Sequence, residues 1–299
     1  MYYESVKFTL SIFALMIIVA DSGSTKCDWI ISGPEGDTMA KTMGFNPFFH
    51  STELINEKIM ENAELSAVSS VVDAVYFYGA GCNSTERNNI VREALVVRFP
   101  NATDIVVDHD LTAAALSTGK GEASIACILG TGSNSGYFDG ANVHEEVPAL
   151  GYVLGDEGSG AYFGKILTRE FLYNRLPSHL QSAFGEQYDL SKESIFKAVY
   201  SDPNPNVYLA SFMRFVSARK NDPYLRDMIY KGLASFATAH ITCYANYKDV
   251  KVNFVGSIAH YFRDILEEVA SNFRFTIGEI QKKPIHELVR YHQAKRQVV

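Results

Sequence analysis

Short apolar runs separated by turns rich in Gly, Pro and Asn dominate the first part of the chain. Runs without polar interruption are typical of buried strands, and apolar residues every three or four positions indicate amphipathic helices. The predicted strands are 16–20, 27–32, 38–43, 71–78 and 103–107, and the predicted helices are 51–66, 84–99 and 111–117. Three hairpin-joined strands followed by alternating helix and strand predict an α/β lobe with a mixed sheet.

The same pattern begins again about 109 residues later. A strand over 123–129, a Gly/Ser turn and a strand over 135–138 lead through Asp139-Gly140, a strong hairpin signal, to a third strand near 142–147. The chain then becomes mostly helical from 160 to 247, and a strand at 252–255 and a helix at 284–297 follow.

The polar stretch 117–121 is the expected junction between two lobes. We therefore expect a first lobe over 16–118 and a second over 119–299, with a large helical insertion in the second. The terminal helix is expected to pack back on the first lobe. The length of 299 residues agrees with about two domains.

Composition narrows the class of protein. Hydrophobic residues make up 47% of the chain, as in ordinary globular proteins. The formal net charge of −7 argues against non-specific binding to nucleic acid or to an anionic membrane, because both need a positive field. It leaves room for a local anion site built from backbone N–H groups.

The start of the chain has two interpretations. The apolar run from Phe8 to Ala20 is too short for a membrane-spanning helix, which needs about 20 residues, but it fits the core of a signal peptide. Alternatively, residues 1–15 are a leader outside the fold and a buried strand begins at Met16. We favour the second interpretation, because cleavage after Ala20 would leave the following loop as a bare terminus. Four widely spaced cysteines without a CxxC motif also favour reduced thiols in a cytoplasmic protein.

Two Gly/Ser turns are the first candidates for chemistry. Asp21-Ser22-Gly23-Ser24-Thr25-Lys26 combines a strand-end carboxylate with a tight turn, which suits a phosphate chain carrying Mg²⁺. Gly130-Thr131-Gly132-Ser133 follows the corresponding strand of the second lobe. Each could be a plain hairpin turn, but two such turns in matching places could hold a phosphate chain between them.

Three further motifs have a structural and a functional interpretation. Asp110, in Asp108-His109-Asp110, could be a general base or the N-cap of the next helix. The acids Asp156 and Glu157, bracketed by glycines, could bind a polyol or cap the helix after Gly160. Gly256-Ser257 could be an ordinary strand-to-helix turn or a place where a flat ring approaches the backbone.

Taken in order, ADSGSTK, DHDLTAAAL, LGTGSNSG, GDEGSG and FVGSIA resemble the BadF/BadG/BcrA/BcrD-type ATPases, and within them the N-acetylglucosamine kinases of the sugar kinase/actin/Hsp70 superfamily. The resemblance runs from about Met16 to His292. It implies two ribonuclease-H-like (actin-like ATPase) lobes, with ATP and a sugar meeting in the cleft between them.

The resemblance also implies roles for single residues. Residues 21–26 match the first phosphate motif, with Asp21 orienting Mg²⁺ through water, and residues 130–133 match the second. Gly256 and Ser257 match the adenosine motif, and Asp110 matches the catalytic base. Asn46, Asp110, Asp156 and Glu157 match sugar-binding positions. Ser22 and Ser24 stand where the family often has glycine, and a glycine frequent after Pro284 is absent.

The resulting expectation is a cytoplasmic, homodimeric, ATP- and Mg²⁺-dependent kinase that phosphorylates the 6-hydroxyl of N-acetylglucosamine or a close amino sugar. Two alternatives stay open. One is a dehydratase-activating ATPase of the same family, and the other is a sensor that binds nucleotide and sugar without catalysis.

Overall fold

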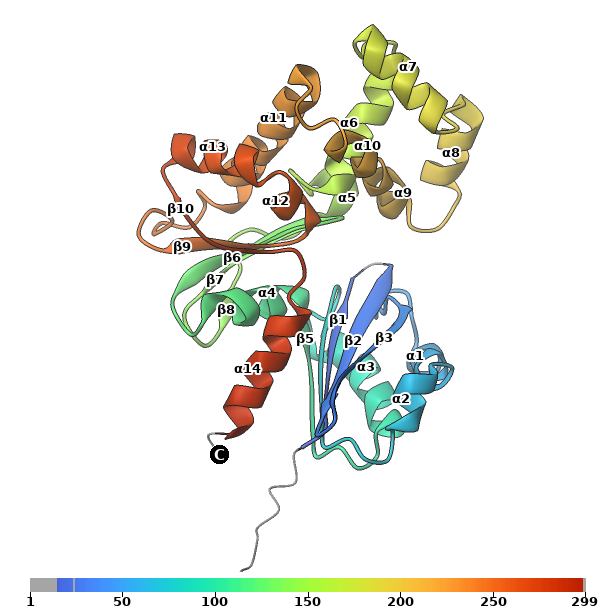
Figure 1. The fold of residues 1–299 in the computed structure, drawn as a ribbon, viewed down its shortest axis with the longest axis vertical. Coiled ribbons are helices and arrows are strands. Elements are labelled where there is room, and N and C mark those ends of the chain that lie inside the picture. Colours follow the sequence, from blue (N-terminus) through green and yellow to red (C-terminus); the bar gives the residue numbers. More distant parts are fainter. Residues whose placement is uncertain (1–14, 24, 298–299) are drawn as a thin grey trace, which may run out of the picture.

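The computed structural model describes residues 15–23 and 25–297 (Figure 1). The expected leader over 1–15 lies almost wholly outside the described residues. The described residues form two five-stranded mixed sheets, each with its own helices, and two further helices lie between the sheets. The fold is therefore the α/β, two-lobed architecture expected from the sequence.

The first sheet has the strand order β3-β2-β1-β4-β5. Its strands are β1 (Ile17–Ser22), β2 (Lys26–Gly33), β3 (Gly36–Met43), β4 (Ala74–Gly79) and β5 (Asp104–His109). β1 pairs antiparallel with β2 and parallel with β4. This central position explains the apolar run of β1, since Ile17 to Ala20 are buried on both faces.

The second sheet repeats this topology in the order β10-β9-β6-β7-β8. Its strands are β6 (Ser124–Leu129), β7 (Ser133–Phe138), β8 (Val143–His144), β9 (Lys251–Val255) and β10 (Thr276–Gln281). β6 pairs antiparallel with β7 and parallel with β9, as β1 does with β2 and β4. The repeated sequence pattern thus corresponds to a repeated sheet.

One helix of the first lobe is divided. The prediction of a single helix over 51–66 is wrong, because α1 (Thr52–Met60) ends at Met60 and a separate helix, α2 (Ala63–Ala67), follows. Asn62 causes the break, since its side chain accepts a 3.0 Å hydrogen bond from the Leu65 N–H and caps α2. α3 (Thr85–Arg98) lies beside α1 and β5.

Helices dominate the second lobe. The predicted helical stretch contains α6 (Gly160–Leu172), α7 (Ser178–Gln187), α8 (Lys192–Tyr200), α9 (Pro205–Ser211), α10 (Met213–Ser217) and α11 (Pro223–His240), preceded by the short α5 (Gly151–Leu154). α12 (Ser257–Tyr261) and α13 (Arg263–Phe273) follow β9. Figure 1 shows α6 to α10 rising from the second sheet, away from the first. One large apolar core joins these helices to β6 and β9.

Two helices lie between the sheets. α4 (Asp110–Gly119) contacts strands of both sheets, and its Ala113, Ala114 and Ala115 are buried. α14 (Ile285–Gln297) packs Ile285, Leu288 and Val289 into an apolar cluster with strands of the first sheet. Because α4 is shared, a lobe boundary at 118/119 stays a prediction.

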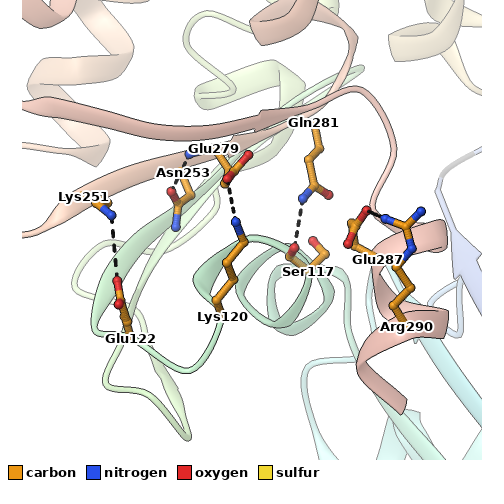
Figure 2. A network of polar contacts seen from close by, with 9 residues as sticks. All are labelled: Ser117, Lys120, Glu122, Lys251, Asn253, Glu279, Gln281, Glu287 and Arg290. Carbon is orange, nitrogen blue, oxygen red and sulfur yellow. Dashed lines mark hydrogen bonds and ion pairs between the residues drawn. The ribbon is translucent and has the colours of Figure 1, made fainter. Parts of the chain in front are cut away.

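The C-terminal end of α4 is fastened to the second sheet (Figure 2). Lys120 forms a 2.8 Å ion pair with Glu279, and the Gln281 side chain donates a 2.9 Å hydrogen bond to the Ser117 carbonyl.

Within the described residues, no helix is both long and apolar enough to cross a membrane.

Candidate active site

The carboxyl ends of six strands open onto one cleft of about 570 Å³. Residues after β1, β4 and β5 line one side, and residues after β6, β9 and β10 line the other. The predicted site residues that line it are Asp21, Ser22, Gly23, Thr25, Lys26, Asn46, Asp110, Gly130, Thr131, Gly132, Ser133, Asp156, Gly256 and Ser257. Glu157 is not among the lining residues, and Ser24 lies outside the described part of the chain.

The first turn is built from backbone contacts. The Gly23 N–H donates a 3.0 Å hydrogen bond to the Lys26 carbonyl and closes the loop between β1 and β2. The buried Ser22 hydroxyl donates to the Phe45 carbonyl at 3.2 Å and accepts from the Phe45 N–H at 2.8 Å. Its hydroxyl therefore holds the loop next to Asn46 in place and is already occupied within the protein.

Asn46 is held at the cleft by tight packing. Its side-chain oxygen accepts a 2.9 Å hydrogen bond from the Phe48 N–H. Gly81, at φ +86°, lies so close that an added Cβ would stand 2.5 Å from this oxygen. A glycine is therefore needed after β4, both for its backbone conformation and for space.

Acidic residues gather on the first-sheet side. Asp21 and Asp28 are register partners on β1 and β2, and Asp110 begins α4 after β5. Burial raises the pKa of Asp21 to about 7, with further contributions from the negative charges of Asp110 and Asp28. The raised pKa means chiefly that the charged form of Asp21 is poorly solvated, so a cation close to it would favour that form.

Asp110 is the first residue of α4, and His109 occupies the N-cap position without a side-chain capping bond. The Asp110 carboxylate lies 3.2 Å from His109 Nε2 and lines the cleft. A carboxylate at a helix N-terminus is favoured by the positive end of the helix dipole.

The second turn is fastened to the start of α6. The Gly130 carbonyl accepts a 2.8 Å hydrogen bond from Gly160 N–H, and the Thr131 carbonyl accepts one of 3.0 Å from Ala161 N–H. Ser159 is the N-cap of α6, so the acids at 156 and 157 do not cap it. These contacts fix the position of the loop relative to the helix.

Asp156 and Glu157 separate in the structure. The Asp156 carboxylate lies in the cleft and accepts a 3.3 Å hydrogen bond from the Ser133 N–H. Burial raises the pKa of Asp156. Glu157 turns away, with its carboxylate 3.7 Å from Nε2 of the buried His240.

Gly256 brings the loop after β9 against the end of β6. Its φ is +130°, and an added Cβ would stand 2.2 Å from the Leu129 carbonyl oxygen. Only a glycine fits this close approach, which places Gly256 and Ser257 beside Gly130 in the cleft.

Several lining residues were missed by the sequence analysis, namely Asp28, Phe48, Gly81, Asn83, Asn134, Lys282 and Lys283. The two lysines follow β10, a strand that was not predicted because its sequence, TIGEIQ, alternates only weakly. The position of Asp28, seven residues after Asp21 on the partner strand of a short hairpin, was the available signal for that residue.

Residues present in the cleft fit a water-mediated Mg²⁺ site. In residues 15–23 and 25–297, no group of three or more His, Cys, Asp or Glu side chains could hold a metal ion directly. Mg²⁺ bound to nucleotide usually keeps several waters and needs one or two carboxylates. Asp21, which lies in the cleft near Asp28 and Asp110, provides such a carboxylate.

Comparisons with known proteins agree with this geometry. The chain matches no protein-family model and no curated protein sequence. Its structure is similar to that of a candidate N-acetylglucosamine kinase from Porphyromonas gingivalis, with a TM-score of 0.87 and 34% identity over 94% of this chain and 100% of the other. A candidate N-acetylglucosamine kinase from Chromobacterium violaceum gives a TM-score of 0.69 at 16% identity, covering 93% and 98% of the two chains.

A ROK family glucokinase from Streptomyces griseus, in complex with glucose and AMPPNP, shares the fold. Its TM-score is 0.54 at 17% identity, covering 94% of this chain and 99% of the glucokinase. The first match spans the whole relative at a level of identity that chance does not produce. The chain therefore belongs to the sugar kinase family that includes the Porphyromonas gingivalis protein.

Proposed function

We propose that this protein is an ATP-dependent amino-sugar kinase that phosphorylates the 6-hydroxyl of N-acetylglucosamine. The observation that carries the proposal is the cleft, where Asp110 and one Gly/Ser turn on the side of the first sheet meet the second Gly/Ser turn and Gly256 on the other side. Phosphoryl transfer depends mainly on alignment and charge neutralisation, and such loops supply backbone donors for both. The 34% identity with a candidate kinase for the same sugar supports the substrate class.

The nucleotide would lie across the second sheet. We assign Gly256 and Ser257 to adenosine, because the glycine backbone leaves room for a flat ring. Residues 130–133 would bind the phosphates from one side and residues 21–26 from the other. The Streptomyces griseus glucokinase, which shares this fold, is in complex with AMPPNP, an ATP analogue.

Asp21 would hold the Mg²⁺ of MgATP through water. When bound, Mg²⁺ neutralises charge on the phosphates as the transferred group leaves. Asp21 would orient this charge from the end of β1, where it is firmly anchored in the central strand.

Asn46, Asp156 and Asp110 would bind the sugar. Asp110 would accept the proton of the 6-hydroxyl while its oxygen forms the new bond to the γ-phosphorus, and the bond from that phosphorus to the β-phosphate oxygen breaks to release ADP. Glu157 lies outside the cleft lining, so its proposed sugar contact requires its loop to move as the lobes close.

An ADP-release assay over a panel of amino sugars tests this proposal. We expect ADP release that depends on N-acetylglucosamine and on Mg²⁺, with ³¹P NMR identifying a 6-phosphate product. Sugar-independent ADP release would favour an ATPase that acts on another protein. Nucleotide and sugar binding without ADP release would favour a sensor.

We also propose that the kinase is a cytoplasmic homodimer. Sedimentation at several concentrations tests the dimer, and fractionation of the native cell tests the compartment. A monomer at all concentrations would contradict the first of these proposals.

A further inference from the structure

The repeated sheet topology pairs each strand end of the first lobe with one of the second. β5 and β10 are the equivalent edge strands, each parallel to its neighbour and each leading into a helix that lies between the sheets. β5 delivers Asp110 to the cleft, and β10 delivers Lys282 and Lys283 to it. The cleft therefore receives a carboxylate from one side and ammonium groups from the equivalent position on the other.

Lys283 is held in a defined position. Its Nζ lies 2.8 Å from Oδ2 of Asp28, and Nζ of Lys26 lies 3.4 Å from the same oxygen. Burial alone would raise the pKa of Asp28, but the two lysines lower it, so the carboxylate is charged. Asp28 thus joins a lysine of the C-terminal segment to the first phosphate turn.

The Asp28 carboxylate is nearly inaccessible to water, with its residue 3% exposed. Its Oδ1 is buried and has no hydrogen-bond partner among the described residues. A buried charge with one unsatisfied oxygen is costly unless a cation stays close. Asp28 therefore restrains Lys283 at its ammonium group, while the lysine side chain keeps 38% exposure and lines the cleft.

We infer that Lys283 binds the polyphosphate of the nucleotide and that Asp28 is a positioning residue for it. This inference rests on the proposed kinase function and adds a second cation to Lys26 of the first turn. Lys26 and Lys283 together place two positive charges beside Asp21, Asp28 and Asp110. An ammonium group in this place attracts an anion with several charges and is indifferent to an uncharged nucleoside.

The alternative is a purely structural link, in which Lys283 only fastens the start of α14 to β2. The two roles differ in what they change. A structural link would affect stability and all ligands alike, whereas a phosphate contact would affect ATP and leave adenosine unchanged.

Isothermal titration of ATP and of adenosine, without sugar, separates them. Lys283→Met should weaken ATP binding about 10- to 100-fold, as expected for the loss of a charged hydrogen bond, and leave adenosine binding unchanged. Lys283→Arg should recover most of the ATP affinity. Asp28→Asn should weaken ATP binding by a smaller factor, because Lys283 is then less restrained.

The double variant Asp28→Asn/Lys283→Met covers the case in which Lys283→Met does not fold, because it leaves no unpaired buried charge. Its ATP affinity should equal that of Lys283→Met, since Asp28 acts through Lys283. Lys231→Met, which breaks an exposed 2.6 Å ion pair with Asp227 far along α11, is the matched control and should change neither ligand.

Equal ATP affinity in wild type and in the double variant would overturn the inference. An unchanged ATP affinity in Asp28→Asn would overturn the positioning role of Asp28. If the wild-type protein bound no ATP at all, the proposed function itself would fail, and this result is distinct from both.

Discussion

Three features of the fold place Asp110, the proposed general base. It stands at the end of a parallel edge strand, at the first residue of a helix, and on the wall of the cleft. Asp108, two residues earlier in β5, has a carboxylate that accepts a 2.7 Å hydrogen bond from the His109 N–H. Of these two acids, only Asp110 lines the cleft.

Replacing Asp110 by Asn should therefore abolish most of the turnover. The amide has nearly the same shape but cannot take the hydroxyl proton, an effect worth about 10²- to 10⁴-fold. We expect kcat to fall by this factor while the dissociation constants for ATP and sugar stay within a few-fold of wild type. Asp108→Asn is the matched control and should retain activity. A kcat near that of wild type in Asp110→Asn would show that another group accepts the proton.

For single residues, the sequence predicted those site residues that stand at a turn directly at the end of a strand. Asp21 lies near the end of the apolar strand β1, and Asp110 and Gly256 directly follow β5 and β9, so their place at the carboxyl ends of strands could be expected. The Ser22 contact with Phe45 could not, because it joins residues 23 apart through a hydroxyl. Lys283 was missed because its role depends on Asp28, which lies 255 residues away in sequence.

Among the elements, α6 is the one that fixes the second phosphate turn. It packs closely on α9. Gly164 of α6 lies so near to α9 that an added Cβ would stand 2.0 Å from the Leu209 carbonyl oxygen. Backbone atoms cannot yield as a flexible side chain can. The position of α6, and with it that of the turn, therefore requires glycine at position 164.

Gly164→Ala should separate the two helices and lower the free energy of unfolding by about 1–3 kcal/mol. Gly185→Ala in α7 is the control, since its Cβ would lie 3.4 Å from the Phe171 ring. There the substitution should raise the free energy of unfolding by about 0.5–1 kcal/mol, because Gly is unfavourable inside a helix. Urea unfolding measures both values. An equal effect of the two changes would refute the tight α6–α9 contact.

α14 is held against the first sheet by a buried histidine. His292 Nε2 lies 2.8 Å from the Tyr78 hydroxyl, and the ring stacks on Tyr76 with centroids 3.5 Å apart. Burial, together with the nearby Lys295 and Arg296, lowers the pKa of His292 to about 3, although Asp104 opposes them. The folded protein therefore keeps this histidine neutral.

Stability should consequently fall in acid. Below the ordinary histidine pKa of about 6.5 the unfolded chain takes up a proton that the folded chain excludes until about pH 3. Between pH 8 and pH 5 this costs about 2 kcal/mol of unfolding free energy. Urea titrations of wild type and His292→Gln at both pH values measure this loss. Between pH 8 and pH 5 the unfolding free energy of His292→Gln should fall by about 2 kcal/mol less than that of wild type. The exposed His286→Gln should behave as wild type, and the same pH dependence in all three would contradict the assignment.

Element prediction was accurate for the buried central strands and less so for the two edge strands of the second sheet. The central strands β1, β4 and β6 have near-continuous apolar sequences and were predicted within a few residues. β8 is two residues long where a strand over 142–147 was expected, since pairing with β7 stops at His144. The edge strand β10 was missed, because its side chains are mostly half-buried and carry little pattern.

At the scale of the whole molecule, the cleft exists only where two copies of one topology face each other. The first sheet contributes acids and one Gly/Ser turn, and the second contributes the other turn, Gly256 and Lys283. α4 joins them, since it begins with Asp110 and ends fastened to β10 through Lys120 (Figure 2). A ligand in the cleft would therefore contact both halves at once.

Ligand binding should accordingly couple the unfolding of the two halves. A non-hydrolysable ATP analogue with Mg²⁺ and N-acetylglucosamine, each at 100 times its dissociation constant, should add about 2.7 kcal/mol per ligand to the stability of the folded state. Calorimetry should show either one transition at a higher temperature or two transitions that merge, because unfolding of either half destroys the site. Asp110→Asn should show the same shift as wild type, since it is expected to keep both binding sites. A ligand-induced shift confined to one of two separate transitions would contradict a site shared by both sheets.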